Sequence, residues 1–169
     1  MKKIFIDGSA GTTGLRIHER LGKRKEFEII TLSEENRKDP AARAEIINRS
    51  DVTFLCLPDD AAIEAVAMVN NPNTVIIDTS TAHRTAAGWT YGFPELVGKD
   101  TVAKAKRIAN PGCHASGFVA LVAPLVKAGV LPSDAALTAF SLTGYSGGGK
   151  SMIAEYESEE RDGLLSAPR

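Results

Sequence analysis

The sequence has little of what marks several large classes of protein. Only two of its 169 residues are cysteines, which excludes a disulfide framework and predicts a reducing, cytoplasmic location. Twenty Lys and Arg residues against 21 Asp and Glu residues leave a net charge of −1, so no basic field predicts nucleic-acid binding. No run approaches the roughly 20 apolar residues of a membrane span. The N-terminus also lacks the apolar core and cleavage site of a signal peptide.

What the sequence does have is the composition of a globular protein. Hydrophobic residues make up 43% and charged residues 24%, which is enough apolar material to bury a core. The length fits one domain, or one domain and part of another.

The first half of the chain alternates short apolar runs with helix-like segments. The expected strands are residues 3–7, 28–32, 52–57 and 75–78, and the expected helices are residues 12–22, 39–48 and a segment starting at 59 or 60. In the first helix, Leu15, Ile17 and Leu21 are candidate core positions. This alternation predicts an α/β fold, with a Rossmann-type parallel sheet that has helices on both faces.

The alternation stops after residue 78. We expect a structured loop at 79–97, a strand at 107–109, an apolar helix at 115–128, a strand of a new layer at 135–143 and a flexible loop at 144–150. Residues 155–169 show no convincing element. We therefore predict a dinucleotide-binding domain at 1–112. Residues 113–169 would begin an α+β substrate domain that is incomplete.

A glycine-rich segment joins the first strand to the first helix. Its glycines follow a GxxGxxG pattern, and such glycines let the backbone approach a pyrophosphate at a helix N-terminus. The alternative is a turn needed only for close packing of strand and helix. The predicted cofactor-binding residues of this loop are Gly8, Ser9, Ala10, Gly11, Thr12, Thr13 and Gly14.

The end of the second strand bears on the choice of cofactor. Hydroxyl and basic residues suit the 2′-phosphate of NADP, whereas an acidic residue suits the ribose hydroxyl of NAD. Ser33, Arg37 and Lys38 favour NADP, although Glu34 and Glu35 lie beside them. A solvated loop that contacts no cofactor is the alternative for Arg37 and Lys38.

One of the two cysteines lies in a setting that favours reactivity. Cys113 follows Pro111 and Gly112 and precedes an apolar helix, where the helix dipole favours the nucleophilic thiolate. Ser116 and nearby backbone N–H groups are candidates for stabilising an oxyanion. Cys56 lies inside an apolar strand and fits a buried structural cysteine instead. No histidine among His18, His83 and His114 is a convincing general base for the thiol, and no cluster predicts a bound metal.

Taken in order, the motifs resemble those of the N-acetyl-gamma-glutamyl-phosphate reductases in their shorter form, and specifically the N-terminal portion of these enzymes. The resemblance rests on the segments 8–14, 54–58, 78–84, 91–95, 110–113 and 144–150. Aspartate-semialdehyde dehydrogenases are similar in architecture. The Asn110–His114 turn, Thr81–Arg84 and Tyr91–Glu95 favour the reductase.

This resemblance implies an NADPH-dependent step of arginine biosynthesis. N-acetylglutamyl phosphate would be reduced to its semialdehyde through a Cys113 thioester, with release of inorganic phosphate. Pro58 and Ser80 would bind NADP, whereas Arg84, Asn110 and Ser116 would bind the substrate, and residues 144–150 would form another wall. A homo-oligomer is expected. The family's chains are nearly twice as long and carry their catalytic histidine in the second half.

Three alternatives stay open. An aspartate-semialdehyde-dehydrogenase-like reductase would share the same chemistry with a different substrate. A non-catalytic NADP-binding module fits the missing base but leaves the presented Cys113 without a use. An inert fragment would bind no dinucleotide at all.

Overall fold

The computed structural model describes residues 1–158, without the side chains of Tyr145, Ser146, Lys150 and Ser151. Its first half alternates strands and helices as predicted from the sequence. These elements are β1 (Lys2–Asp7), α1 (Thr12–Leu21), β2 (Phe27–Ile30), α2 (Pro40–Arg49), β3 (Val52–Leu55), α3 (Asp59–Ala67) and β4 (Val75–Asp78). Asp39 caps α2 by accepting a hydrogen bond from the Ala41 N–H at 3.0 Å, and Pro40 occupies the first helical position.

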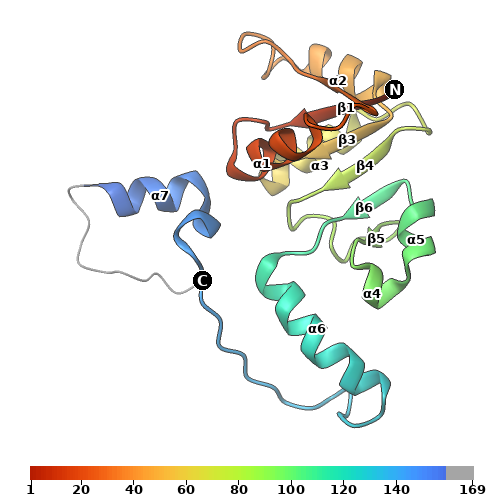
Figure 1. The fold of residues 1–169 in the computed structure, drawn as a ribbon, viewed down its shortest axis with the longest axis vertical. Coiled ribbons are helices and arrows are strands. Elements are labelled where there is room, and N and C mark those ends of the chain that lie inside the picture. The colour runs from red at the N-terminus through yellow and green to blue at the C-terminus, as the bar shows by residue number, and fades with distance from the viewer. Residues whose placement is uncertain (159–169) are drawn as a thin grey trace.

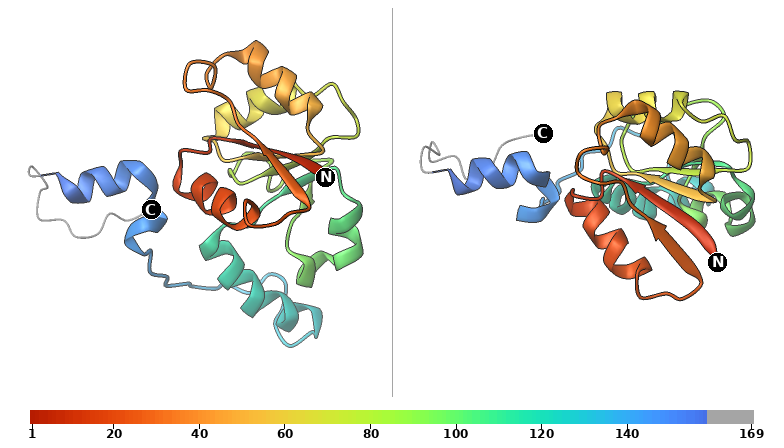
Figure 2. Two further views of the ribbon diagram at one scale, coloured as in Figure 1. Left: turned by 45° about the horizontal axis from the view of Figure 1, so that its top comes forward. Right: turned by 90° about the horizontal axis from the view of Figure 1, so that it is seen from above.

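The strands form one six-stranded sheet in the order β2-β1-β3-β4-β6-β5, and every neighbouring pair is parallel. Strand β1 lies between β2 and β3. The chain therefore places β2 on one side of β1, crosses over, and continues the sheet from β3 on the other side. Figure 2 shows α1 on one face of the sheet and α2 and α3 on the other. The predicted Rossmann-type α/β fold is therefore confirmed for this part of the chain.

The core lies between the sheet and helices α2 and α3. Six buried residues form it, namely Phe5, Ile47, Leu55, Ala62, Ala65 and Ile76. Helix α1 contributes less than its sequence pattern predicts. Leu15 is a candidate core position from the sequence, but it is 57% exposed, and the buried residue of α1 is Gly14, which packs against the backbone of Gly8 and Ser9.

The region expected to be a structured loop at 79–97 contains additional regular structure. A two-residue strand, β5 (Thr90–Tyr91), pairs with β6 (Arg107–Ala109), and α4 (Pro94–Val97) and α5 (Lys99–Lys104) connect them. The sequence signal for β5 is weak because two residues are too few to show alternation.

Two predictions for the last quarter are wrong for the described residues. Residues 135–143 were expected to form a strand, but they pair with no other strand of the described part. A strand needs a partner for its backbone groups, and residues 1–158 offer none in this region. Residues 144–150, expected to be a loop, instead form η1 (Tyr145–Gly148) and the start of α7 (Gly149–Glu157). Residues 159–169 of the segment expected to lack regular structure lie outside the described residues.

Helix α6 (Cys113–Lys127) begins where β6 ends and leads away from the sheet (Figure 1). It is strongly apolar, yet none of its residues is buried. Leu96 of α4 and one face of α6 line a shallow apolar groove of about 410 Å³.

Candidate active site

The predicted site residues converge on one edge of the sheet. Because all six strands are parallel, the segments that follow β1, β3, β4 and β6 emerge at the same edge. These segments carry the glycine-rich loop, Pro58, Ser80 and Asn110 respectively. The sequence could predict this convergence because a parallel sheet needs only its strand positions to place these ends together.

The glycine-rich loop needs glycine at two positions for reasons internal to the chain. Gly8 has a φ of +83°, and a side chain there would lie 2.2 Å from the Cys56 carbonyl oxygen. At Gly14, a side chain would lie 2.5 Å from the Gly8 carbonyl oxygen and 2.7 Å from the Ser9 Cα. These two glycines allow α1 to start tight against the end of β1.

Gly11 is different, because a side chain there would meet nothing closer than the Gly8 carbonyl oxygen at 3.4 Å. Packing within the chain therefore does not require this glycine. Gly11 is also the N-cap of α1, and no side chain caps the helix. A helix N-terminus without a side-chain cap is an arrangement that can bind a phosphate group. The role of this loop as the pyrophosphate site stays a prediction.

The residues predicted to read the 2′-phosphate lie on the surface beyond β2. Ser33 is exposed, and its carbonyl oxygen accepts hydrogen bonds from the backbone N–H groups of Asn36 and Arg37. The Arg37 Nε lies 3.0 Å from Glu34 Oε2, in an exposed ion pair. Arg37 therefore has a partner in the chain, and its role toward NADP stays a prediction. Pro58 is the exposed N-cap of α3, also at the sheet edge.

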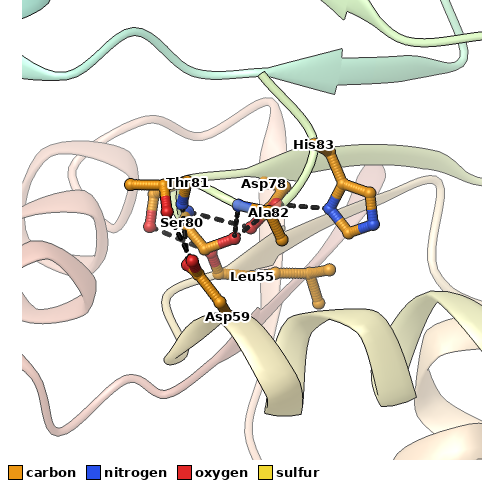
Figure 3. A network of polar contacts seen from close by, with 8 residues as sticks. Leu55, Asp59, Asp78, Ser80, Thr81, Ala82 and His83 are labelled. Carbon is orange, nitrogen blue, oxygen red and sulfur yellow. Dashed lines mark hydrogen bonds and ion pairs between the residues drawn. The ribbon is translucent and has the colours of Figure 1, made fainter. Parts of the chain in front are cut away.

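A buried polar network follows β4 (Figure 3). Asp78 is completely buried, and its Oδ2 accepts a hydrogen bond from the Ser80 hydroxyl at 2.7 Å. Oδ1 accepts the Ser80 N–H at 2.9 Å, and His83 Nδ1 lies 2.6 Å from Oδ2. The Ser80 hydroxyl also accepts the Ala82 N–H. Ser80 was predicted to bind the cofactor, but in the structure its proton is donated to Asp78.

The same loop is anchored from outside by α3. Asp59, the first residue of α3, accepts the Thr81 N–H at 2.8 Å and also the Thr81 hydroxyl. These hydrogen bonds lower the pKa of the Asp59 carboxyl below its ordinary value, the hydroxyl contributing most. His83 is buried as well, and its ring stacks on Trp89 with the centroids 4.0 Å apart. The His83 ring is thus engaged by the Asp78 carboxylate through Nδ1 and by the Trp89 indole through its face.

The fixed loop carries Arg84 to the cysteine turn. A methyl group on Gly112 would lie 2.7 Å from Arg84 Nη1 and 3.1 Å from its Cζ, so the guanidinium packs on the Gly112 backbone. The buried Arg84 Nε has no hydrogen-bond partner among the described residues. A cation with unused donor capacity therefore lies directly beside the residue that precedes Cys113, which suits an anionic substrate.

Cys113 is the first residue of α6, and its side chain is exposed. Gly112 is the N-cap, again without a capping side chain, so the first-turn N–H groups of α6 are open. Cys56 contrasts with it, because burial raises the pKa of the Cys56 thiol to about 11. The structure therefore agrees with the prediction that Cys113, and not Cys56, is the presented thiol.

The other predicted substrate residues surround this turn. The Asn110 N–H donates to the Asp78 carbonyl oxygen at 2.7 Å, which ties the β6 end to the β4 end. Its side-chain amide donates to the Pro111 carbonyl oxygen. The Ser116 hydroxyl donates to the Gly112 carbonyl oxygen at 2.8 Å and so stabilises the helix start. Both ring nitrogens of His114 are engaged, Nδ1 by the Ser141 hydroxyl and Nε2 by the Thr143 hydroxyl.

The described part of the chain shows neither a metal-ligand cluster nor a membrane-spanning helix. Within residues 1–158, no group of three or more His, Cys, Asp or Glu side chains could hold a metal ion. Among the helices of the same residues, none is long and apolar enough to cross a membrane.

Sequence reasoning missed two buried pairs near the site. The sequence pattern predicts Asp78 as the end of a strand and His83 as a loop residue, and their spacing of five residues and the nearby Trp89 are the only signals of the pair. The second pair joins Asp7 to Arg43 across 36 residues. Only an acidic residue at the end of an otherwise apolar strand could have pointed to it.

Comparison with known families agrees with this geometry. The family description "Semialdehyde dehydrogenase, NAD binding domain" matches residues 34–105. A second description, "Semialdehyde dehydrogenase, dimerisation domain", matches residues 113–167. The boundary between the two matches falls just before Cys113.

Several curated relatives are similar along nearly the whole chain. An N-acetyl-gamma-glutamyl-phosphate reductase of Chelativorans sp. is 54% identical over 162 residues, which are 95% of this chain and 52% of the relative. N-acetyl-gamma-glutamyl-phosphate reductase 2 of Pseudomonas putida is 50% identical over 167 residues, which are 98% and 52%. The chain thus spans about half the length of the curated relatives that it matches.

Solved structures support the fold. Aspartate semialdehyde dehydrogenase II from Vibrio cholerae, complexed with ASA, has a TM-score of 0.61 at 17% identity, covering 92% of this chain and 50% of that one. Aspartate semialdehyde dehydrogenase with NADP from Candida albicans has a TM-score of 0.53 at 20% identity, covering 75% and 47%.

A parallel nucleotide-binding sheet with a cysteine presented at its carboxyl edge places the chain in the semialdehyde-dehydrogenase class. Within this class, the sequence identity of 50–54% to the curated relatives indicates the family. The chain belongs to the family of the N-acetyl-gamma-glutamyl-phosphate reductases, as its motifs predicted, and matches about half the length of these relatives.

Proposed function

We propose that the chain is the cofactor- and cysteine-bearing part of an NADPH-dependent N-acetyl-gamma-glutamyl-phosphate reductase. The observation that carries this proposal is the position of Cys113. Its exposed thiol starts α6 at the same sheet edge as the glycine-rich loop, and the Arg84 guanidinium backs the turn before it. A protein that only bound a dinucleotide would have no use for a thiol in this place.

The proposed reaction begins at the Cys113 sulfur. The thiolate attacks the carbonyl carbon of N-acetylglutamyl phosphate, a C–S bond forms, and the C–O bond to phosphate breaks with release of inorganic phosphate. The bound reduced nicotinamide would supply the hydride that the resulting thioester needs. The C–S bond then breaks, so that the semialdehyde leaves and the thiolate is regenerated.

Other residues would bind and orient the reactants. The loop residues Gly8–Gly14 would hold the pyrophosphate, Ser33 and Arg37 the 2′-phosphate, and Pro58 would line the cofactor site. Arg84 would pair with the phosphate or carboxylate of the substrate. Open N–H groups in the first turn of α6 would stabilise the oxyanion that forms on the attacked carbonyl.

Two predicted residues fit an indirect role better than direct contact. The Ser80 hydroxyl donates to Asp78 and the Ser116 hydroxyl to Gly112, so both stabilise the segments that carry Arg84 and Cys113. Asn110 keeps the end of β6 beside β4 through its backbone. We place Ser80 and Ser116 as positioning residues of the site.

The acid–base group is assigned to the part of the relatives that this chain does not span. His83 is bound to Asp78, and His114 contacts Ser141 and Thr143, so neither is free to serve Cys113 in this arrangement. A homo-oligomer and a cytoplasmic location stay predictions, the first in agreement with the match to a dimerisation domain.

The test follows the reaction in reverse, with N-acetylglutamate semialdehyde, NADP and phosphate. Because the chain spans about half of its relatives, we would join it to the unmatched half of the Chelativorans sp. relative and assay this fusion protein. We expect phosphate-dependent formation of NADPH that Cys113→Ser abolishes and Cys56→Ser leaves unchanged. Full activity of Cys113→Ser would refute the mechanism.

The same experiment separates the alternatives. Turnover of aspartate semialdehyde in place of the acetylated substrate would identify an aspartate-semialdehyde-dehydrogenase-like reductase. NADPH binding without turnover of either semialdehyde would favour the non-catalytic module. Absence of NADPH binding by the 169-residue chain would favour the inert fragment.

A further inference from the structure

An ion pair is buried directly behind the glycine-rich loop. Asp7 is the last residue of β1 and is 5% exposed, and Arg43 of α2 is 8% exposed. Arg43 donates from Nε and Nη2 to Asp7 Oδ2, at 3.0 and 2.9 Å. Both side chains have thus been removed from water to meet each other.

Stability alone does not account for this pair. Removing two charges from water is expensive, and an apolar pair of similar size often stabilises a fold as well or better. Burial raises the pKa of the Asp7 carboxyl, and the hydrogen bond and charge of Arg43 offset this only in part. Keeping the buried Asp7 carboxylate ionised therefore costs free energy. The location of the pair in the fold must explain what it contributes in return.

Its position is next to the candidate phosphate site. Asp7 immediately precedes Gly8, whose φ of +83° starts the loop, and the Gly8 N–H also stabilises the Asp7 carboxylate. An anion in this place would repel a pyrophosphate bound by the loop. Arg43 approaches the same carboxylate from α2 and cancels its charge.

We propose that Arg43 is a charge-compensating residue for dinucleotide binding. Its guanidinium keeps the region behind the glycine-rich loop neutral overall when a pyrophosphate arrives. This inference rests on the proposed cofactor, because it assumes that the loop binds NADPH.

The inference predicts opposite effects for the two partners, which a purely structural pair would not show. In Arg43→Met the Asp7 charge is uncompensated, so NADPH should bind about tenfold more weakly. In Asp7→Asn the Arg43 charge is left behind the loop, so NADPH should bind at least as tightly as to the unchanged chain. The double variant is neutral and should restore affinity to within about threefold of the unchanged chain.

The measurement is the NADPH dissociation constant of the 169-residue chain, from nucleotide fluorescence at fixed salt concentration. Two matched controls carry the same charge changes away from the loop. Asp51→Asn removes a carboxylate paired with Lys2 near the start of β1, and Arg49→Met removes an exposed arginine paired with Glu45 on α2. Both controls should leave the dissociation constant within about twofold, because solvent screens distant charges.

The results distinguish a charge-compensating pair from a purely structural one. Equal weakening in Arg43→Met and Asp7→Asn would show that the pair only supports the fold, and would overturn the inference. Should Arg43→Met fail to fold, Asp7→Asn and the double variant still decide, since weaker binding by Asp7→Asn contradicts the inference. If the unchanged chain binds no NADPH, the proposed cofactor itself is wrong, which is a different failure.

Discussion

The guanidinium of Arg84 lies against the backbone of Gly112, with Nη1 2.7 Å from the place that a methyl group on Gly112 would occupy. Two segments that are 28 positions apart in the sequence therefore meet directly beside Cys113. The contact joins the loop after β4 to the turn after β6. It gives the site a cation whose position depends on the absence of a side chain at residue 112.

Gly112→Ala should therefore impair the site without harming the fold. The φ of Gly112 is −78°, which alanine adopts freely, so the added methyl group displaces the flexible Arg84 end and not the backbone. We expect the KM for the acyl phosphate to rise by about tenfold in the fusion protein, because a displaced guanidinium loses its charge-assisted hydrogen bonds.

The matched control for this prediction lies one turn further along the same helix. A side chain at Gly117 would meet nothing within 4 Å. Gly117→Ala should keep the wild-type KM and stabilise α6 by up to about 1 kcal/mol. An unchanged KM in Gly112→Ala would show that Arg84 does not meet the substrate.

The glycine-rich loop allows binding to be separated from folding. Gly11→Val should weaken NADPH binding by at least about tenfold, because its side chain fills the space that a pyrophosphate needs, while the melting temperature changes little. Gly14→Ala should lower both, since its methyl group meets the backbone of Gly8 and Ser9. Fluorescence titration and thermal melting measure the two properties on the same samples. Unaltered NADPH affinity in Gly11→Val would remove the loop from the cofactor site.

Much of this site could be predicted because it depends on local sequence. The glycine-rich loop can be predicted from the strand and helix that flank it. The setting of Cys113 can be predicted from the preceding Pro111 and Gly112. Neither prediction needs the rest of the chain. The alternation of elements then brought the strand ends to one edge. What could not be predicted depends on contacts between distant residues: Arg43 on Asp7, Arg84 on Gly112, and the exposure of Leu15.

The wrong predictions have a related physical origin. Residues 135–143 carry an apolar pattern that suits a strand, but a strand exists only when a neighbour accepts its backbone hydrogen bonds. The start of α7 was hidden by three consecutive glycines, which local propensity assigns to a loop. The hydrophobic pattern of a segment therefore predicts a strand reliably only where the neighbouring strand that would pair with it can also be predicted.

The two cysteines should differ sharply in reactivity. At pH 8 the Cys56 thiol is protonated, because burial raises its pKa to about 11, and its side chain is half-buried, whereas Cys113 is exposed. Iodoacetamide should therefore label the native chain once, and label Cys113→Ser not at all on the same time scale. In urea both thiols should react. Labelling of native Cys113→Ser at the rate of the native chain would contradict the assignment of Cys113 as the accessible thiol.

The anchoring of the site loop by Asp59 should appear in the pH dependence of stability. Hydrogen bonds from Thr81 lower the pKa of Asp59 below its ordinary value of 3.8. For an acid with a lowered folded-state pKa, the stabilisation is complete above the unfolded-state pKa and is lost as the pH falls through the folded-state pKa. Asp59→Ala should thus cost up to about 1 kcal/mol at pH 7, a small value because the pair is exposed.

Asp60→Ala is the matched control, because Asp60 also lies in the first turn of α3 and interacts equally with the helix dipole. Urea denaturation of both variants at pH 7 and at pH 3 gives the comparison. The extra loss in Asp59→Ala over Asp60→Ala should be present at pH 7 and smaller at pH 3, which lies below the ordinary pKa of 3.8 that Asp59 has in the unfolded chain. An extra loss of the same size at both values would mean that Asp59 anchors the loop without its charge, so that shape and not ionisation holds Thr81 in place.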